Sequence, residues 1–300
     1  MKQKRVLITG ASGMLGGTLV KYFTPQYDVF ATSNQLNLPY ANKHMVFDLN
    51  DKDYSSLIEW SRPDVIIHTA ALTNGNLCDT NPELAIRTNS LVLDKLALAI
   101  DISTRLFHIS TDAVFSEEAS NSNERDTTSS DSVYGKSKEL GEFFLKLRSH
   151  NFTIVRTTIV GLNQLEERNG FTEWIINSAK ESQNIGLFDD VKFTPITCIH
   201  LAEMLKVILE NGLFKNEIVH IGSSEIYTKY DFGVSLLKAV GFSGENVYPS
   251  KLSQFKGRAK RSMDQSLDSS YFERVTGIKL PNLEKTIQQL KIELNEQKGN

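Results

Sequence analysis

Short apolar runs alternate with longer amphipathic stretches through the first half of the chain. Runs rich in β-branched residues predict buried strands at 5–9, 28–32, 45–48, 64–69, 106–110 and 153–157. Apolar residues at helical spacing predict helices at 13–23, 53–60, 83–100 and 134–147. This alternation is typical of a parallel sheet with right-handed crossovers. We therefore expect an α/β fold built on a Rossmann-type, doubly wound parallel sheet.

The pattern becomes irregular beyond Gly161. We expect helices at 171–180, 201–211, 229–240 and 283–297, a strand at 218–221, and a loop with one short strand at 186–197. A polar stretch at 117–132, rich in Ser, Asn, Asp and Thr, precedes the helix that starts at Tyr134. Its composition predicts a mobile surface loop, and its position predicts that the loop borders a cleft.

Composition narrows the class of protein. The 300 residues are 40% hydrophobic, which suffices for a sizeable core, and the net charge of −3 argues against nucleic-acid binding. Cys78 and Cys198 lie too far apart in sequence for a metal-ligand motif, so we expect buried thiols, no metal site and a reduced, cytoplasmic protein. No apolar run approaches the roughly 20 residues that span a bilayer, so no membrane association is expected.

The first predicted strand ends in a glycine-rich turn that leads into the first helix. Gly10 permits the turn, Gly13 lets a pyrophosphate approach the backbone, and Gly16 lets the helix pack close to the sheet. The free N–H groups and the positive end of the helix dipole favour phosphate. This strand, turn and helix predict a dinucleotide-binding loop, to which Ser12, Met14 and Leu15 also contribute.

The ends of strands two and four bear on the choice of cofactor. No acidic residue stands near Ser33, where an acid would bind a free ribose 2′-hydroxyl. This absence favours NADP, but no arginine follows either, so NAD stays open. The small residues Ala70 and Ala71 end strand four and leave room for a nucleotide, with Thr73 close by. We expect these four residues to contact the cofactor.

Tyr134 and Lys138 form the candidate catalytic pair. Four residues apart on a helix, their side chains lie on one face. A phenol beside an ammonium is a proton donor whose anion is stabilised. The preceding strand ends in Ser110 and Thr111, and ligands of parallel sheets bind beyond the carboxyl ends of strands. These hydroxyls are therefore expected to point into the same crevice.

Glycines spaced G-x-x-G-x-x-G together with Tyr-x-x-x-Lys resemble the extended short-chain dehydrogenase/reductase superfamily. Within it, further stretches look like dTDP-4-dehydrorhamnose reductase and its relatives. They are Ser-Thr-Asp-x-Val-Phe at 110–115, Tyr-Gly-Lys-Ser-Lys at 134–138, Gly-Glu-Phe at 141–143, Val-Arg-Thr at 155–157 and Arg-Ser-Met-Asp-Gln-Ser-Leu-Asp at 261–268. The resemblance covers the whole chain.

The resemblance implies a role for each residue of the constellation. Thr111 or Ser110 binds the substrate carbonyl, Tyr134 protonates its oxygen as hydride arrives, and Lys138 holds the nicotinamide ribose and lowers the Tyr134 pKa. Asn89 matches the asparagine that anchors a proton-relay water. Asp48 resembles the adenine-contacting aspartate, with Leu49 beside it; a strand-end cap is the alternative interpretation of Asp48.

By the same resemblance, residues 1–160 form the NAD(P)-binding domain, with 199–224 returning to it. Residues 161–198 and 225–300 then form a smaller, discontinuous C-terminal lobe that binds a nucleotide-diphosphate sugar. Asp112 and Ile159 would line its sugar pocket, and Arg258 and Arg261 could pair with the pyrophosphate or belong to a solvated basic run. The assembly is left open, with a homodimer as one option.

The chain departs from the family pattern at several positions. The family usually carries aromatic residues where this chain has Thr158 and Ile159, and Ala113 replaces a common tyrosine. Sugar-nucleotide dehydratases place a glutamate at that position, so Ala113 disfavours dehydration. The resemblance therefore predicts NAD(P)H-dependent reduction of a keto sugar nucleotide. A nucleotide-sugar epimerase, or a non-catalytic regulatory subunit like the β subunit of methionine adenosyltransferase, is the alternative.

Overall fold

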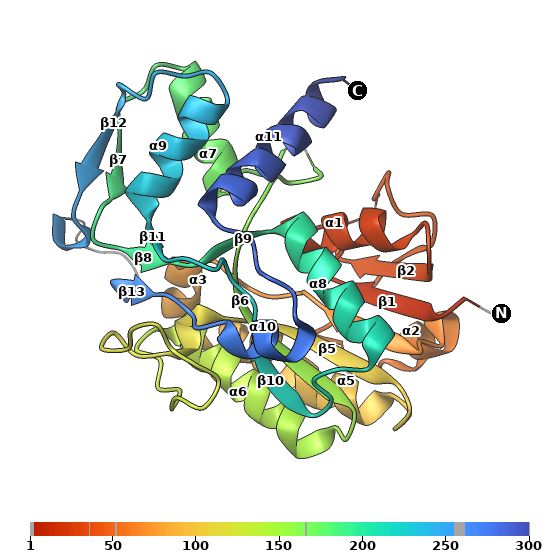
Figure 1. Cartoon of the computed structure of the whole chain (residues 1–300). Helices are drawn as coiled ribbons and strands as arrows, with labels where there is room; N and C mark the ends of the chain where they lie inside the picture. The colour runs from red at the N-terminus through yellow and green to blue at the C-terminus, as the bar shows by residue number, and fades with distance from the viewer. Residues whose placement is uncertain (1–2, 36, 52, 166, 255–261, 300) are drawn as a thin grey trace.

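An eight-stranded sheet forms the centre of the molecule (Figure 1). The computed structural model describes residues 3–35, 37–51, 53–165, 167–254 and 262–299. Its strands are β1 (Arg5–Thr9), β2 (Asp28–Ser33), β3 (His44–Val46), β4 (Val65–His68), β5 (Arg105–Thr111), β6 (Phe152–Val160), β9 (Pro195–Thr197) and β10 (Glu217–His220). Every pairing among them is parallel, in the order β10-β6-β5-β4-β1-β2-β3 with β9 beside the end of β6. The predicted doubly wound α/β sheet is confirmed.

Helices cover both faces of this sheet. On one face α1 (Met14–Phe23) and α8 (Cys198–Asn211) lie side by side and pack on Val6 and Ile8 of β1 (Figure 1). On the other face α2 (Ser55–Ser61), α5 (Val92–Ala99) and α6 (Val133–Arg148) pack on Leu7 and its neighbours. The strands are apolar throughout because both faces are buried. After β3 the chain crosses to β4 on the other side of β1, which makes the β1–β4 edge the switch point for ligands.

The helix expected at 83–100 is present, with a π-helical turn in its middle. The chain forms α3 (Gly75–Thr80), α4 (Pro82–Ile86), a π-helical turn (Arg87–Leu91) and α5. Asn74 and Asn81 cap the starts of α3 and α4 through their side chains, which separates α3 from the continuous helical run 82–99. The π-helical turn packs against α6 at Gly141, where a Cβ atom would lie 2.5 Å from the Asn89 carbonyl oxygen.

The C-terminal half contains more strand than expected. The stretch 186–197 holds β7 (Ile185–Phe188), β8 (Lys192–Phe193) and β9 rather than a loop with one strand. β12 (Val247–Ser250) pairs with β7, while β11 (Tyr227–Thr228) and β13 (Asp264–Gln265) flank β8. Strands of two to four residues are too short to show a hydrophobic period. Most of them could therefore not be predicted from the pattern of residues.

Three helices build a second core around these short strands. They are α7 (Phe171–Lys180), α9 (Lys229–Ala239) and α11 (Leu283–Gly299), and their apolar side chains enclose Phe193 and Phe232. The remaining helix, α10 (Ser270–Thr276), was not predicted; its Phe272 joins the core beside α8. Figure 1 shows α7, α9 and α11 grouped at one end of the molecule, beyond the carboxyl ends of the main strands.

The polar loop at 117–132 is anchored, which corrects the expectation of a mobile loop. Ser122 donates its backbone N–H to the Ser266 carbonyl oxygen, and its own carbonyl accepts from the Asp268 N–H. The Glu124 carboxylate accepts from the His220 N–H at 2.8 Å. The loop therefore connects the end of β10 with the segment after β13.

Both cysteines are free and buried, as predicted. Within the described part of the chain, no helix is long and apolar enough to cross a bilayer.

Candidate active site

The glycine loop has the close contacts that its spacing predicts. Gly10 has φ +69°, and a Cβ atom there would lie 2.6 Å from the Ala70 backbone. A Cβ atom on Gly16 would lie 2.2 Å from the Gly10 carbonyl oxygen, so the helix can approach the turn only without a side chain there. Gly13 directly precedes α1, with Met14 as its first residue and Leu15 buried behind it. This cradle fits a pyrophosphate on the helix N-terminus.

The residues predicted to contact the adenosine lie at the end of β2 and just after β3. Ser33 ends β2, and its hydroxyl shares a hydrogen bond with His44 Nε2 at 3.1 Å. Asp48 lies two residues after β3 ends, is exposed, and accepts hydrogen bonds from the Asn50 N–H and side chain at 2.8 and 3.1 Å. It thus acts as a turn cap in this structure. Leu49 is partly buried against the core under β2, and its carbonyl accepts from Tyr54.

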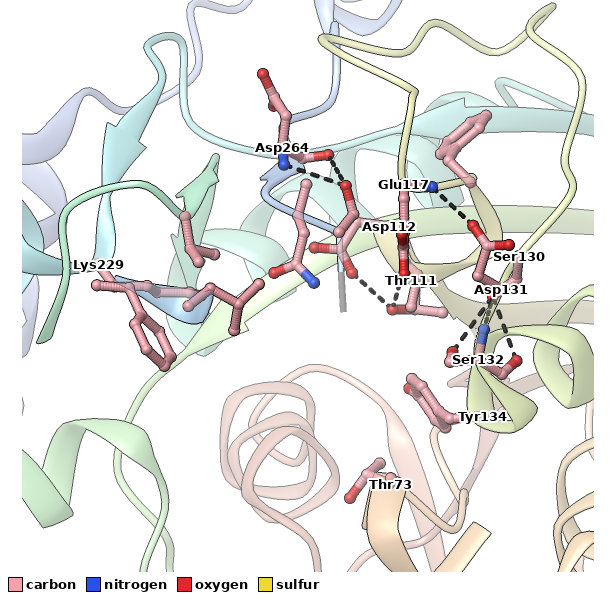
Figure 2. Close-up of a pocket in the computed structure, with 18 residues that line it drawn as sticks. Thr73, Thr111, Asp112, Glu117, Ser130, Asp131, Ser132, Tyr134, Lys229 and Asp264 are labelled. Carbon is pink, nitrogen blue, oxygen red and sulfur yellow. Dashed lines mark hydrogen bonds between the residues drawn. The ribbon is translucent and has the colours of Figure 1, made fainter. Parts of the chain in front are cut away.

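A cavity of about 240 Å³ opens beyond the carboxyl ends of β4 and β5 (Figure 2). Thr111, Asp112 and Tyr134 face it together, with Thr73 beside Tyr134. Its other walls come from the start of α3, the turn after β5, the polar loop and the C-terminal half: Gly75, Ala113, Phe115, Glu117, Ser130, Asp131, Ser132, Phe188, Val191, Lys229, Leu252, Ser262, Asp264 and Gln265. The predicted pair of a hydroxyl and a phenol therefore lies at one cavity, on the sheet edge where β1 also leads into the glycine loop.

Tyr134 is placed by the first turn of α6. Ser132 caps this helix by accepting the Gly135 N–H at 3.0 Å, and a Cβ atom on Gly135 would lie 2.0 Å from the Ala113 carbonyl oxygen. Burial raises the pKa of the Tyr134 phenol, and the Thr111 hydroxyl acts in the opposite direction. The phenol is therefore protonated at neutral pH, as a proton donor must be.

Lys138 lies one helical turn further and is 2% exposed. Its Nζ donates to the Ile109 carbonyl oxygen at 2.8 Å. Burial lowers its pKa to about 7, and the nearby Glu142 carboxylate acts in the opposite direction. The expected lowering of the Tyr134 pKa does not occur in this structure, because burial outweighs the other influences on the phenol.

Asp112 is the buried acid of the cavity. Its carboxylate accepts hydrogen bonds from the Thr111 hydroxyl at 2.8 Å and the Thr158 hydroxyl at 2.6 Å. Burial raises its pKa, while these two hydrogen bonds and the charge of Lys229 lower it. Lys229, which the sequence did not single out, begins α9 and places its Nζ 3.4 Å from the centre of the Phe193 ring.

Asn89 lies within the π-helical turn and connects two parts of the site. Its side-chain oxygen accepts the Leu72 N–H at 2.7 Å, and its amide donates to the Ser137 hydroxyl at 2.9 Å. It is 1% exposed. Asn89 thus joins the segment after β4, which carries Ala70, Ala71 and Thr73, to the helix of Tyr134 and Lys138.

Ser110 and Ile159 lie elsewhere than predicted. The Ser110 hydroxyl is buried and donates to Glu142, whose carboxylate also holds Arg156 at 2.7 Å. Ser110 therefore points toward α6 and away from the substrate carbonyl expected beside Thr111. Ile159 packs against the core of α1 and α8, and the described residues that line the cavity do not include it. Arg258 and Arg261 lie outside the described residues.

Glu142 and Arg156 belong to two of the stretches that carry the family resemblance. The structure joins them as an ion pair whose side chains are 2% and 3% exposed. No pattern in the sequence indicated that pairing, because α6 and β6 meet only in the folded chain. The other missed cavity residues come from the start of α3, the turn after β5, the polar loop and the C-terminal half, which meet only in the folded chain.

A family model described as the RmlD substrate binding domain matches residues 4–295. The chain belongs to this family. The dTDP-4-dehydrorhamnose reductase of Aggregatibacter actinomycetemcomitans is 29% identical over 301 residues, which covers 96% of this chain and 98% of the relative.

Solved structures of such reductases share the fold. A hypothetical dTDP-4-dehydrorhamnose reductase from Sulfolobus tokodaii is 30% identical, with a TM-score of 0.79 over 93% of this chain and 98% of that chain. The dTDP-4-dehydrorhamnose reductase from Bacillus anthracis, solved in complex with NADP, is 25% identical, with a TM-score of 0.86 over 98% of this chain and 100% of that chain. The predicted family is confirmed.

Proposed function

We propose that this protein reduces a keto group on a nucleotide-diphosphate sugar with NAD(P)H, in the manner of a dTDP-4-dehydrorhamnose reductase. The observation that carries the proposal is the convergence of Tyr134 and Thr111 on one cavity, at the sheet edge where β1 leads into the glycine loop. Relatives with that name match the whole chain, and one was solved with NADP. The protein is accordingly an NAD(P)-dependent oxidoreductase.

The chain's own residues supply the proton for the carbonyl oxygen and orient the carbonyl and the ribose. When bound, the nicotinamide supplies the hydride that adds to the carbonyl carbon. The Tyr134 hydroxyl donates its proton to the carbonyl oxygen, and the Thr111 hydroxyl hydrogen-bonds the same oxygen. Lys138, one turn behind Tyr134, holds the ribose and stabilises the phenolate left after proton transfer. Asn89 positions this helix against the segment after β4.

We propose that the two ligands bind to different parts of the chain. Residues 1–160 with 199–224 would hold the cofactor, which agrees with the pairing of β10 with β6 and the packing of α8 on α1. Residues 161–198 and 225–300 would hold the sugar nucleotide, since Phe188, Lys229 and Asp264 line the cavity. Arg258 and Arg261, proposed for the pyrophosphate, precede the cavity residue Ser262 in the sequence.

Turnover of sugar nucleotides tests this function. Purified protein should oxidise NADPH in the presence of a 4-keto-6-deoxyhexose nucleotide, and the product should gain two mass units. Tyr134→Phe should lower kcat by at least about 100-fold while the dissociation constant for NADPH changes less than about twofold, because the phenol ring remains.

Two other outcomes would contradict the proposal. Tight dinucleotide binding without turnover on any keto sugar nucleotide would indicate a regulatory subunit. Inversion of a sugar carbon without net NADPH oxidation would indicate an epimerase.

We also propose a homodimer formed through α5 and α6. Five apolar side chains are exposed on or beside these packed helices: Leu91, Leu98, Ile102, Phe143 and Leu147, at 37%, 63%, 74%, 54% and 58%. Exposed apolar side chains gathered on two packed helices are typical of protein interfaces, and a two-fold interface uses the same surface of both copies.

Light scattering during size-exclusion chromatography tests the assembly. The expected mass is twice 33.7 kDa. Phe143→Glu with Leu147→Glu should give monomer, and Ile226→Glu, at an exposed apolar position outside this face, should stay dimeric. A monomeric wild type would contradict the proposal.

A further inference from the structure

The segment that follows β6 lies across the start of α1. A Cβ atom on Gly161 would lie 3.4 Å from Met14 Sδ, and one on Gly17 would lie 2.8 Å from the Gln164 side chain. The Arg168 Nη2 donates to the Ser12 hydroxyl at 3.4 Å. The segment therefore covers the glycine loop from the side of the C-terminal half.

Contacts with α7 and α11 hold this segment in place. The Glu173 carboxylate accepts from the Asn163 side chain at 3.0 Å and from the Gly170 N–H at 2.8 Å. Gln297 in α11 donates to the Asn163 carbonyl oxygen at 3.2 Å. Arg168 thus lies on an anchored segment, close to the positive end of α1.

The surroundings of Arg168 favour an anion. Its side chain donates to the neutral Ser12 hydroxyl, and among the described residues no ion pair within 4.0 Å includes Arg168. A guanidinium beside the N-terminus of a helix repels its dipole, so a phosphate between the two would stabilise both. Arginine suits phosphate because its fork of donors can bind two oxygens.

Ser12 lies where the glycine loop meets the end of β2. The neighbouring Ala11 donates its N–H to the Thr32 carbonyl oxygen at 3.0 Å and accepts from the Tyr40 hydroxyl at 3.0 Å. In this fold the adenosine ribose binds at the end of the second strand, where an arginine accommodates the 2′-phosphate of NADP. Ser33 and Asn34 supply no charge at that strand end.

We propose that Arg168 binds the adenosine 2′-phosphate and makes this protein prefer NADPH to NADH. The cation missing after β2 comes instead from the loop after β6. The inference rests on the proposed function only in that a dinucleotide binds at the glycine loop.

Binding measurements without any sugar substrate test the proposal. The ligands are NADPH and NADH, followed by fluorescence, and 2′,5′-ADP and 5′-ADP, followed by calorimetry. Arg168→Gln should raise the dissociation constants of NADPH and 2′,5′-ADP by roughly 10- to 100-fold. The dissociation constants of NADH and 5′-ADP should change less than about twofold. Arg168→Lys should recover part of the loss, because it restores the charge without the fork. Arg274→Gln, an exposed arginine on α10, removes the same charge and should leave all four affinities unchanged.

Three results would overturn the proposal. Equal losses for NADPH and NADH would place Arg168 on the pyrophosphate, unchanged affinities would place it outside the site, and a wild type without preference for NADPH would remove the basis for the assignment. Failure of the proposed function looks different, because NADPH preference would then depend on Arg168 while no keto sugar is reduced.

Discussion

Ser110 and Thr111 are adjacent on β5, yet their hydroxyls point to opposite faces of the sheet. Successive side chains alternate along a strand, so only one of the two can face the cavity. Thr111 does so, whereas Ser110 joins the buried pair of Glu142 and Arg156. The sequence placed both at the correct strand end, but the choice between them required the position of α6.

This difference predicts separate effects for the two hydroxyls. Thr111→Val should lower kcat/KM by roughly 100-fold or more, since a donor to the developing oxyanion is lost. Its stability should also fall by about 1–2 kcal/mol, because Asp112 loses a buried hydrogen bond. Ser110→Ala should keep most of the activity and lower stability by about 1–2 kcal/mol, because Glu142 loses a buried hydrogen bond. Steady-state kinetics and urea unfolding of both variants decide the matter; a large kinetic loss in Ser110→Ala would reverse the assignment.

At the scale of elements, α6 carries both the proton donor and its neighbouring charge. It is fixed by Gly135 against Ala113, by Gly141 against the π-helical turn, and by the Glu142–Arg156 pair against β6. A buried pair of this kind contributes little net stability, but an unpaired member is costly.

Removing one partner of the pair should therefore harm the protein more than removing both. Arg156→Met should lower the free energy of unfolding by about 3–5 kcal/mol, since it leaves the Glu142 carboxylate buried without its partner. Glu142→Met combined with Arg156→Met should recover most of that loss. Urea unfolding of the single and double variants measures both effects, and a double variant no more stable than the single would contradict this account.

The elements that the sequence predicted well are those with a long, regular period. Strands β1, β2, β5 and β6 and helices α1, α6, α7 and α9 were placed within one to three residues. The helix at 83–100 was also placed correctly, but its period did not reveal the π-helical turn that packs against Gly141 of α6. The short strands of the C-terminal half depend on pairing between distant segments in the same way.

At the scale of the whole molecule, the stability of the fold depends on pH through three buried histidines. The folded state accommodates their imidazoles only in the neutral form. Burial lowers the pKa of His68 and of His220 to about 3, and it lowers the pKa of His108 below its usual range. In the unfolded chain these groups titrate near ~6.5. Their contribution is therefore fully present above about pH 6.5 and is lost as the pH falls toward 3, by about 1.4 kcal/mol per pH unit for each histidine.

Acid should accordingly destabilise the protein between pH 6.5 and 5, although Glu293, whose pKa burial raises to about 7, acts in the opposite direction. The urea midpoint should fall steadily from pH 6.5 to 5. His68→Asn should flatten this dependence by about one proton, and His150→Asn, at an exposed position, should not change it. A midpoint that is flat across this range would show that the three imidazoles accept protons without unfolding.

The glycine loop and the parallel sheet of the molecule could be predicted from the sequence. The cavity was not, because Phe188, Lys229 and Asp264 reach it from segments that share no pattern with Thr111 or Tyr134. Arg168 is a similar case, since it lies beside Ser12 only through the anchoring of its segment by Glu173.

The attachment of Ser122 to Ser266 and Asp268 has a consequence for the newborn chain. The loop that leads into the catalytic helix is held by residues that the ribosome adds long after the loop itself. During synthesis the glycine loop and its strands emerge first, and the wall that Asp264 and Gln265 form emerges long afterwards. Translation therefore separates in time the two halves of a site that the finished protein uses together.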